Sequence, residues 1–137
     1  TAKEKEKDSL EIATMVPHEN LEREKMKNDI TGAIFKARVD SSHPMAFGYK
    51  DTYFSLKIGI DSYDYLENGT VAYISKDTIP VAGFAGSEAQ KKMGKSLVFG
   101  VEEHDKGQIV YMVDNPLFRG FWENGKLFFV NAIFIAK

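Results

Sequence analysis

The C-terminal third of the chain restricts the possible folds more than any other stretch. Residues 109–113 form an apolar run, and a second apolar run covers residues 127–135 with one interruption at Asn131. The first run is apolar on both faces, so we expect it to be a central strand. The second run fits either a buried strand or a helix that is buried all round, and we predict a helix that begins near Glu123 or Asn124.

Shorter elements precede the tail. Residues 97–101 and 108–113 are predicted to pair as antiparallel strands across a turn at residues 104–107. Residues 33–39 alternate with the period of two that is typical of a half-buried strand. Further strands are expected at residues 71–74 and 81–84, and a short helix at residues 88–93 that Ser87 caps and Gly94 ends. Together these elements predict an α/β or α+β fold, with a mixed sheet, a C-terminal antiparallel hairpin and a buried C-terminal helix.

The first thirty residues differ from the rest. The charged side chains of residues 3–8 follow one another without an apolar anchor, and we expect this head to be mobile. Residues 19–27 carry opposite charges at helical spacing, which predicts a solvated helix. We therefore divide the chain into a charged segment, residues 1–30, and a folded domain, residues 31–137. Because the chain opens at Thr1 with no apolar signal region, we also expect it to be a piece of a longer protein.

The composition excludes several classes of partner and chemistry. The 18 basic and 20 acidic side chains give a net charge of -2, which argues against a nucleic acid or an anionic membrane as a partner. The chain has no cysteine, so it forms no disulfide and offers no thiolate nucleophile. Its longest apolar run is far shorter than the roughly 20 residues that span a bilayer.

No arrangement in the sequence matches a catalytic centre. Ser42 and His43 are neighbours, and adjacent residues of an extended segment point to opposite faces, so they do not predict a nucleophile and its base. Residues 102–105 combine acidic side chains with a histidine, but they fall at the predicted hairpin turn, where a solvated turn explains them better than a metal site. We expect no catalytic residue, no metal and no cofactor.

The segment after residue 113 offers one candidate binding site. Asp114 and Asn115 follow a predicted central strand, where open sheets often place functional loops, and Arg119 and Trp122 offer a guanidinium and an indole to a ligand. The structural alternative is favoured: Asp114 or Asn115 caps the next turn, Arg119 pairs with oxygen atoms, and the aromatic side chains pack under the sheet. Asn131 is expected to satisfy a buried backbone group.

Three blocks of this sequence resemble one protein family. The first is residues 107–120, which begin Gly-Gln-Ile-Val-Tyr and end Asp-Asn-Pro-Leu-Phe-Arg-Gly, followed by Lys-Leu-Phe and Asn-Ala-Ile-Phe. The second is residues 31–40 leading to residues 42–49, and the third is residues 81–84. In this order the blocks are similar to the closing segment of large bacterial zinc carboxypeptidases, which carry a noncatalytic glutamine-amidotransferase-like region at the C-terminus. The resemblance covers residues 31–136.

This resemblance implies a fold, a role and a partner. The fold is the later part of a class I glutamine-amidotransferase-like, flavodoxin-like domain. The role is that of a noncatalytic accessory domain, structural or substrate-positioning, which packs against the peptidase domain of the same parent chain in a periplasmic or secreted enzyme. Uncovered apolar surface makes a homodimer possible as well. No zinc ligand carries over, because the metal site of such enzymes lies in the upstream peptidase domain, and the amidotransferase cysteine is absent.

Two other functions stay open at this point. One is a ligand-binding module for a peptide or a glycan that uses the tyrosine-rich middle of the chain with Trp122 and Arg119. An exposed aromatic cleft supports this alternative, and a buried aromatic cluster opposes it. The other is a stand-alone hydrolase built on Ser42 and His43, which requires a carboxylate near His43 and oxyanion donors near Ser42.

Overall fold

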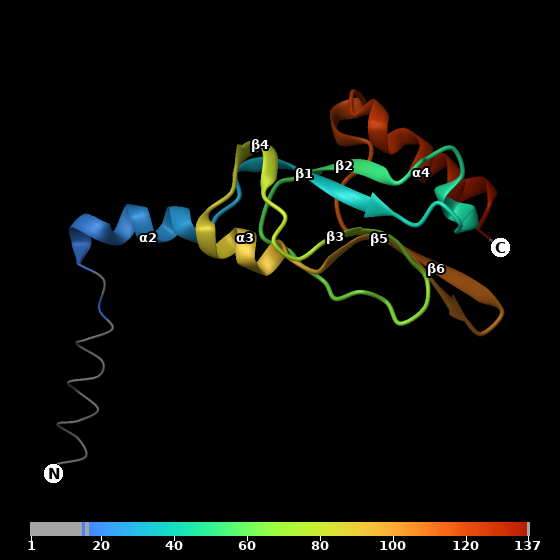
Figure 1. The fold of residues 1–137 in the computed structure, drawn as a ribbon, viewed down its shortest axis with the longest axis horizontal. Helices are drawn as coiled ribbons and strands as arrows, with labels where there is room; N and C mark the ends of the chain where they lie inside the picture. Colours follow the sequence, from blue (N-terminus) through green and yellow to red (C-terminus); the bar gives the residue numbers. More distant parts are fainter. Residues whose placement is uncertain (1–14, 16, 137) are drawn as a thin grey trace, which may run out of the picture.

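A computed structural model of the chain describes residues 15 and 17–136. The expected mobile head therefore lies outside the described residues. The described part contains a curled six-stranded sheet with helices packed around it (Figure 1). Its strands are β1 (Gly32–Val39), β2 (Thr52–Lys57), β3 (Thr70–Ile74), β4 (Pro80–Phe84), β5 (Ser96–His104) and β6 (Gly107–Met112). Its helices are α2 (Leu21–Lys27), α3 (Ser87–Met93) and α4 (Glu123–Phe134), with 3-10 turns η1 (His18–Asn20), η2 (Pro44–Ala46) and η3 (Phe118–Gly120).

The sheet runs in the order β2-β1-β3-β5-β6, and β4 pairs with the first half of β1. Every strand pairing among the described residues is antiparallel, so the expected mixed sheet is wrong and the combination of helices with a sheet is confirmed. The period of two predicted for β1 is confirmed, because Ala33, Phe35, Ala37 and Val39 are all buried.

The C-terminal hairpin forms as predicted, but its second strand does not lie in the middle of the sheet. β5 and β6 pair in register across a turn at Asp105 and Lys106. β6 is the last strand in the order, and Ile109 is 40% exposed. The strand that is buried over its first six residues is β5, because it lies between β3 and β6. β6 carries apolar side chains on both faces, but only one of these faces packs against the core, and the other is partly open to solvent.

The apolar tail forms helix α4, as predicted, beginning at Glu123. The expectation that it is buried all round is wrong. Phe128 and Asn131 are buried, whereas the outer face is exposed at Phe129, Val130, Ile133 and Phe134. Only one side of the helix meets the sheet, since α4 packs against β2 and η2, while Ile133 and Phe134 on the other side are 57% and 80% exposed.

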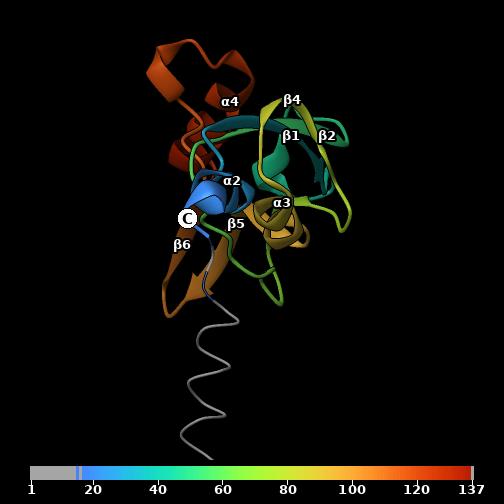
Figure 2. The same cartoon turned by 90° about the vertical axis from the view of Figure 1, so that its left-hand side faces the viewer.

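The two shorter helices sit away from α4. Figures 1 and 2 show α2 and α3 together at the opposite end of the sheet, with α2 projecting from it. The predicted helix near the N-terminus is confirmed as α2, and it buries none of its side chains. Helix α3 also forms, but Ser87 is its first residue and Gly86 takes the capping position, so the predicted Ser87 cap is wrong.

The core joins α4 to the sheet through stacked aromatic rings. The Phe128 ring lies 4.0 Å from the Tyr49 ring and 4.4 Å from the Phe99 ring, centroid to centroid. Tyr53 meets Phe128 edge on at 5.0 Å. The Asn131 amide donates to the carbonyl oxygens of Met45 and Phe47, which confirms the role expected for it. Across the described residues, every helix falls short of the length and apolarity that crossing a membrane requires.

Candidate functional site

Three polar side chains, Ser55, Lys57 and Asp114, form a largely buried cluster. The Lys57 ammonium donates to Asp114 Oδ1 at 2.8 Å, and the Ser55 hydroxyl donates to Asp114 Oδ2. Lys57 is 1% exposed and Ser55 is 0% exposed, while the Asp114 side chain keeps 11%. Burying a charged pair costs several kcal/mol per ion unless the geometry and further hydrogen bonds compensate. Because burying the Lys57–Asp114 ion pair is costly, this pair is the first place to look for a function.

Strand geometry explains how these three residues meet. Ser55 and Lys57 are two apart on β2, so they share the face that looks into the core. Asp114 follows the end of β6, where the Val113 amide still donates to Val98. Because the sheet curls, the segment after its last strand reaches the first strand of the order. The cluster thus connects the two ends of the sheet.

A small cavity adjoins the cluster. It measures about 240 Å³ and is lined by Lys57, Asp61, Asp114, Asn115 and Phe118 among others. Cavities that hold drug-sized ligands start near 300 Å³, so this one fits a few waters or a small polar group. The Lys57 ammonium also donates to the Asp61 carbonyl at 3.3 Å, which leaves one of its three protons for the cavity.

The chemistry of the cluster favours a structural role. The charges of Lys57 and Asp114 compensate each other, and the Ser55 hydroxyl is committed to the carboxylate. A serine that is 0% exposed does not meet a substrate carbonyl, so the group lacks an accessible nucleophile. What the arrangement does is hold β2 and the segment after β6 together.

The four residues predicted to bind a ligand do not form one site. Asp114 belongs to the buried cluster, and Asn115 Oδ1 accepts a hydrogen bond from Leu117 N, as expected for a turn cap. The Arg119 guanidinium lies 5.2 Å from the centre of the Phe118 ring and is exposed. No described carboxylate or carbonyl pairs with it, contrary to the structural alternative for Arg119.

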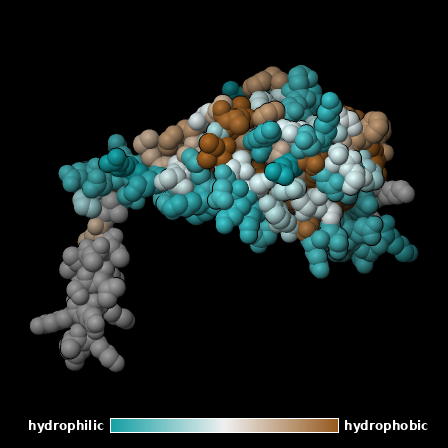
Figure 3. All heavy atoms as spheres, in the orientation of Figure 1, coloured by the Kyte–Doolittle hydropathy of each residue, from teal (hydrophilic) through white to brown (hydrophobic). Residues whose placement is uncertain are grey.

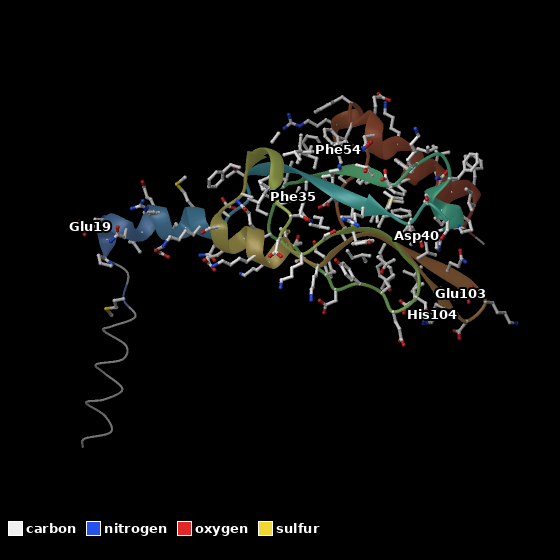
Figure 4. The ribbon with its side chains drawn as sticks, in the orientation of Figure 1. Glu19, Phe35, Asp40, Phe54, Glu103 and His104 are labelled. Atoms are coloured by element: carbon white, nitrogen blue, oxygen red, sulfur yellow. The ribbon has the colours of Figure 1, made fainter. Side chains whose placement is uncertain are left out.

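Trp122 takes a different position again. Its indole nitrogen donates to the Phe54 carbonyl at 3.1 Å, and the Asn124 amide donates to the same oxygen at 3.3 Å. Figure 4 shows Phe54 on β2 below the start of α4. These two donors cover a carbonyl on the outer edge of β2. Phe121 is 60% exposed, so the expectation that all these aromatic side chains pack under the sheet is wrong. The assignment of a ligand to this segment stays a prediction.

The other polar groups singled out in the sequence are also accounted for. The Ser42 hydroxyl and the Ser42 backbone N–H both donate to Asp40 Oδ1. These two hydrogen bonds lower the pKa of the Asp40 carboxyl. His43 Nδ1 accepts from Met45 N at 3.1 Å, so Ser42 and His43 do not form a nucleophile and base. Glu103 and His104 lie at the tip of the β5–β6 hairpin (Figure 4), as the turn prediction required. Within the described part of the chain, no three His, Asp or Glu side chains are grouped as metal ligands.

Two core tyrosines have perturbed titration. Burial raises the pKa of the Tyr49 hydroxyl to about 12, and burial also raises the pKa of the Tyr53 hydroxyl. The Tyr49 hydroxyl donates to the Asn124 carbonyl at 2.6 Å and accepts from Phe128 N at 3.1 Å. Both rings pack on Phe128, so the shifts reflect a buried structural cluster beneath α4.

Sequence reasoning missed Ser55 and Lys57, and the local pattern explains why. In β2, apolar Phe54 and Leu56 alternate with Ser55 and Lys57, so periodicity predicts the two apolar side chains inside. The structure reverses this pattern. Phe54 is 39% exposed, because the inward positions are the ones that meet Asp114.

Comparison with protein-family models, with curated protein sequences and with solved structures found no match.

Proposed function

We propose that this chain is a noncatalytic accessory domain of a zinc carboxypeptidase, and that the outer face of α4 packs against the peptidase domain. The sequence resemblance of residues 31–136 supplies the family. The observation that carries the packing role is the exposed apolar face of α4, formed by Phe129, Val130, Ile133 and Phe134.

The geometry of α4 supports an interface at this place. Val130, Ile133 and Phe134 lie one, four and five residues after Phe129. This spacing groups the four exposed side chains on one side of the helix. Phe134 is 80% exposed and Ile133 is 57% exposed. Contiguous apolar surface of this kind is typical of interaction sites, whereas single exposed apolar residues are ordinary. Figure 3 shows hydrophilic side chains around α2 and brown, apolar side chains reaching the surface of the sheet-bearing part.

The anchoring of α4 makes this face rigid. Asn131 and Phe128 fix the inner side of the helix to η2 and to the aromatic core. Its outer side chains therefore present a preformed surface, and little conformational entropy is lost when a partner binds. Each buried polar side chain of the Ser55, Lys57 and Asp114 cluster has a hydrogen-bond partner, which agrees with a role in packing and positioning.

The proposal extends to fold and location. We infer from the resemblance that the chain completes a glutamine-amidotransferase-like domain. In such a domain, the antiparallel strands of this chain adjoin parallel strands that another part of the protein supplies. This arrangement occurs in large mixed sheets. A periplasmic or secreted location follows from the same resemblance.

The test compares the parent enzyme with and without residues 31–137. We expect deletion to lower the melting temperature or solubility while peptidase activity per folded molecule is kept. A loss of substrate affinity with unchanged stability assigns the domain to substrate positioning instead. A gene in which this chain is not joined to a peptidase domain refutes the proposed family and partner.

Surface variants test the interface itself. Ile133→Ser and Phe134→Ser, made together in the parent enzyme, are expected to weaken domain packing, seen as faster limited proteolysis between the domains. Ile79→Ser is the matched control, because Ile79 is 70% exposed and lies between β3 and β4, away from α4. Equal proteolysis of the two variants removes α4 as the interface.

A further inference from the structure

A polar groove lies on the outer face of the sheet, over β1. It measures about 550 Å³, and its lining includes Lys36 and Arg38 of β1, the start of β2, the end of β3 and the turn between β3 and β4. Lys36 and Arg38 are exposed, whereas Ala37 and Val39 are buried, so the groove is on the face of β1 that turns away from the core. No residue of α4 lines it, so a role for the groove does not depend on the proposed function.

Strand pairing explains why these side chains meet. Arg38 is paired with Thr52 on one side and with Tyr73 on the other. Directly opposed residues of neighbouring strands share one face of the sheet, so these three side chains form a row. Lys36 lies on the same face, two residues and about 7 Å along the strand from Arg38. The turn between β3 and β4 adds Lys76 to the same groove.

The cationic side chains of the groove have no counter-ion. Lys36, Arg38 and Lys76 form no ion pair with any carboxylate of the described residues. Among the described residues that line the groove, Asp51 alone has a carboxylate, and Thr52 Oγ1 donates to it at 3.1 Å. The groove is therefore locally positive, although the whole chain has a net charge of -2. A hollow lined by one sign of charge concentrates ions of the opposite sign.

Two uncharged groups of the groove are also free to donate. The hydroxyls of Tyr73 and Ser75 form no hydrogen bond with the described part of the chain. The Tyr73 ring meets the Tyr65 ring edge on, with centroids 5.2 Å apart, and Thr78 Oγ1 donates to the Ser75 carbonyl at 2.8 Å. These contacts hold the ring and the turn in place, so the donors are largely preorganised.

We propose that this groove binds a small organic phosphomonoester. A phosphate group has three acceptor oxygens and a charge of about -1.5 to -2 at pH 7. The planar guanidinium of Arg38 matches two of these oxygens, and Lys36 and Lys76 supply point charges. The hydroxyls of Tyr73 and Ser75 supply two more donors. The groove is large enough for a drug-sized ligand, so the organic part of the molecule lies beside the phosphate, against the Tyr73 ring.

A single phosphate group suits this groove better than other anions. A nucleic acid is held by several phosphate contacts along its backbone, whereas this groove offers three cations and the chain as a whole is acidic. A carboxylate has two oxygens and one charge, so it leaves part of the donor set without an acceptor.

The probe is phenyl phosphate, titrated into the ¹⁵N-labelled chain. We expect saturable shifts of the amide signals of Thr52, Ser75 and Lys76. Phenyl sulfate has the same ring and three terminal oxygens but a single charge, so we expect it to bind about fivefold more weakly. Inorganic phosphate lacks the ring, and we expect it to bind more weakly than phenyl phosphate.

Variants of the chain complete the test. Arg38→Gln is expected to weaken the binding of phenyl phosphate about tenfold, because it removes charge-assisted hydrogen bonds. Lys36→Gln is expected to weaken it about threefold, the size of an exposed ion pair. Arg23→Gln is the matched control: it removes the same charge from an exposed arginine of α2, outside the groove, and it leaves affinity unchanged. Melting temperatures check that each variant is folded.

Several results overturn the proposal. They are no saturable shift at these amides with millimolar phenyl phosphate, equal affinity for phenyl phosphate and phenyl sulfate, or equal effects of Arg38→Gln and Arg23→Gln. Inorganic phosphate that binds as tightly as phenyl phosphate removes the organic part of the ligand, which also overturns it. A single-stranded oligonucleotide that binds the same amides more tightly than phenyl phosphate identifies nucleic acid as the occupant instead.

Discussion

The buried Lys57–Asp114 pair supplies the sharpest test of how this fold is held together. Replacing Lys57 with methionine keeps most of the side-chain volume and removes the charge. Asp114 then keeps only the Ser55 hydroxyl as a donor, at a side-chain exposure of 11%. Breaking a buried pair by removing one partner costs about 3–5 kcal/mol. Because the carboxylate borders a cavity of about 240 Å³ that admits water, we expect the lower end, about 3 kcal/mol.

The measurement is urea unfolding followed by the fluorescence of Trp122, the single tryptophan of the chain. The expected change is a lower midpoint with an unchanged slope, since the exposed surface on unfolding stays the same. The double variant Lys57→Met with Asp114→Asn is neutral and keeps an acceptor for Ser55. It is expected to cost less than the sum of the single variants, with a coupling of about 2 kcal/mol.

The control is Lys91→Met. Lys91 bonds to Glu88 at 2.7 Å, a distance like that of the buried pair, but its side chain is 72% exposed. We expect no resolvable shift of its midpoint, because water screens the pair. If Lys57→Met shifts the midpoint no more than Lys91→Met does, or if the two single changes at the buried pair simply add, the cluster does not join β2 to the end of β6 in the way described.

Three further predictions concern α4 and the core beneath it. Gly125→Ala is expected to destabilise the fold by about 1–3 kcal/mol despite the better helix propensity of alanine, because an added Cβ would collide with the Pro116 carbonyl oxygen; a higher melting temperature contradicts this. Asn131→Ala is expected to cost about 2 kcal/mol in chemical unfolding, since two carbonyls lose their donor; a change no larger than that of an exposed asparagine argues against this anchor. Stability is expected to fall at alkaline pH. The protonated Tyr49 contributes stability that is fully present below its ordinary pKa of 10.0 and lost as the pH rises through about 12. Melting curves measured across this range check it, Tyr53→Phe should reduce the loss, and a flat profile refutes it.

Local sequence patterns determined most of the elements. The alternation in β1, the turn at Asp105 and Lys106, and the apolar run that became α4 were predictable, because backbone preferences and side-chain periodicity act over a few residues. Asn131 was predictable for a related reason. A lone amide within an apolar run has to be satisfied if it is buried.

Other features depended on contacts between distant parts of the chain. Nothing in residues 107–112 distinguishes an edge strand from a central one, since that depends on which strands are left to pair with it. Likewise, one face of α4 is covered by β2 and η2, and the side chains of its other face are exposed. Periodicity reports how apolar a face is, but it does not report what lies against it.

The clearest division between sequence and tertiary structure is in β2. The sequence by itself determined that apolar and polar side chains alternate over residues 54–57, and tertiary structure decided which half of the alternation faces inward. Ser55 and Lys57 turn to the core, where Asp114 satisfies their donors, and Phe54 turns outward. The reason is physical: an ion pair with good hydrogen-bond geometry offsets the desolvation of its charges only when both partners are present, and the second partner is 57 residues away.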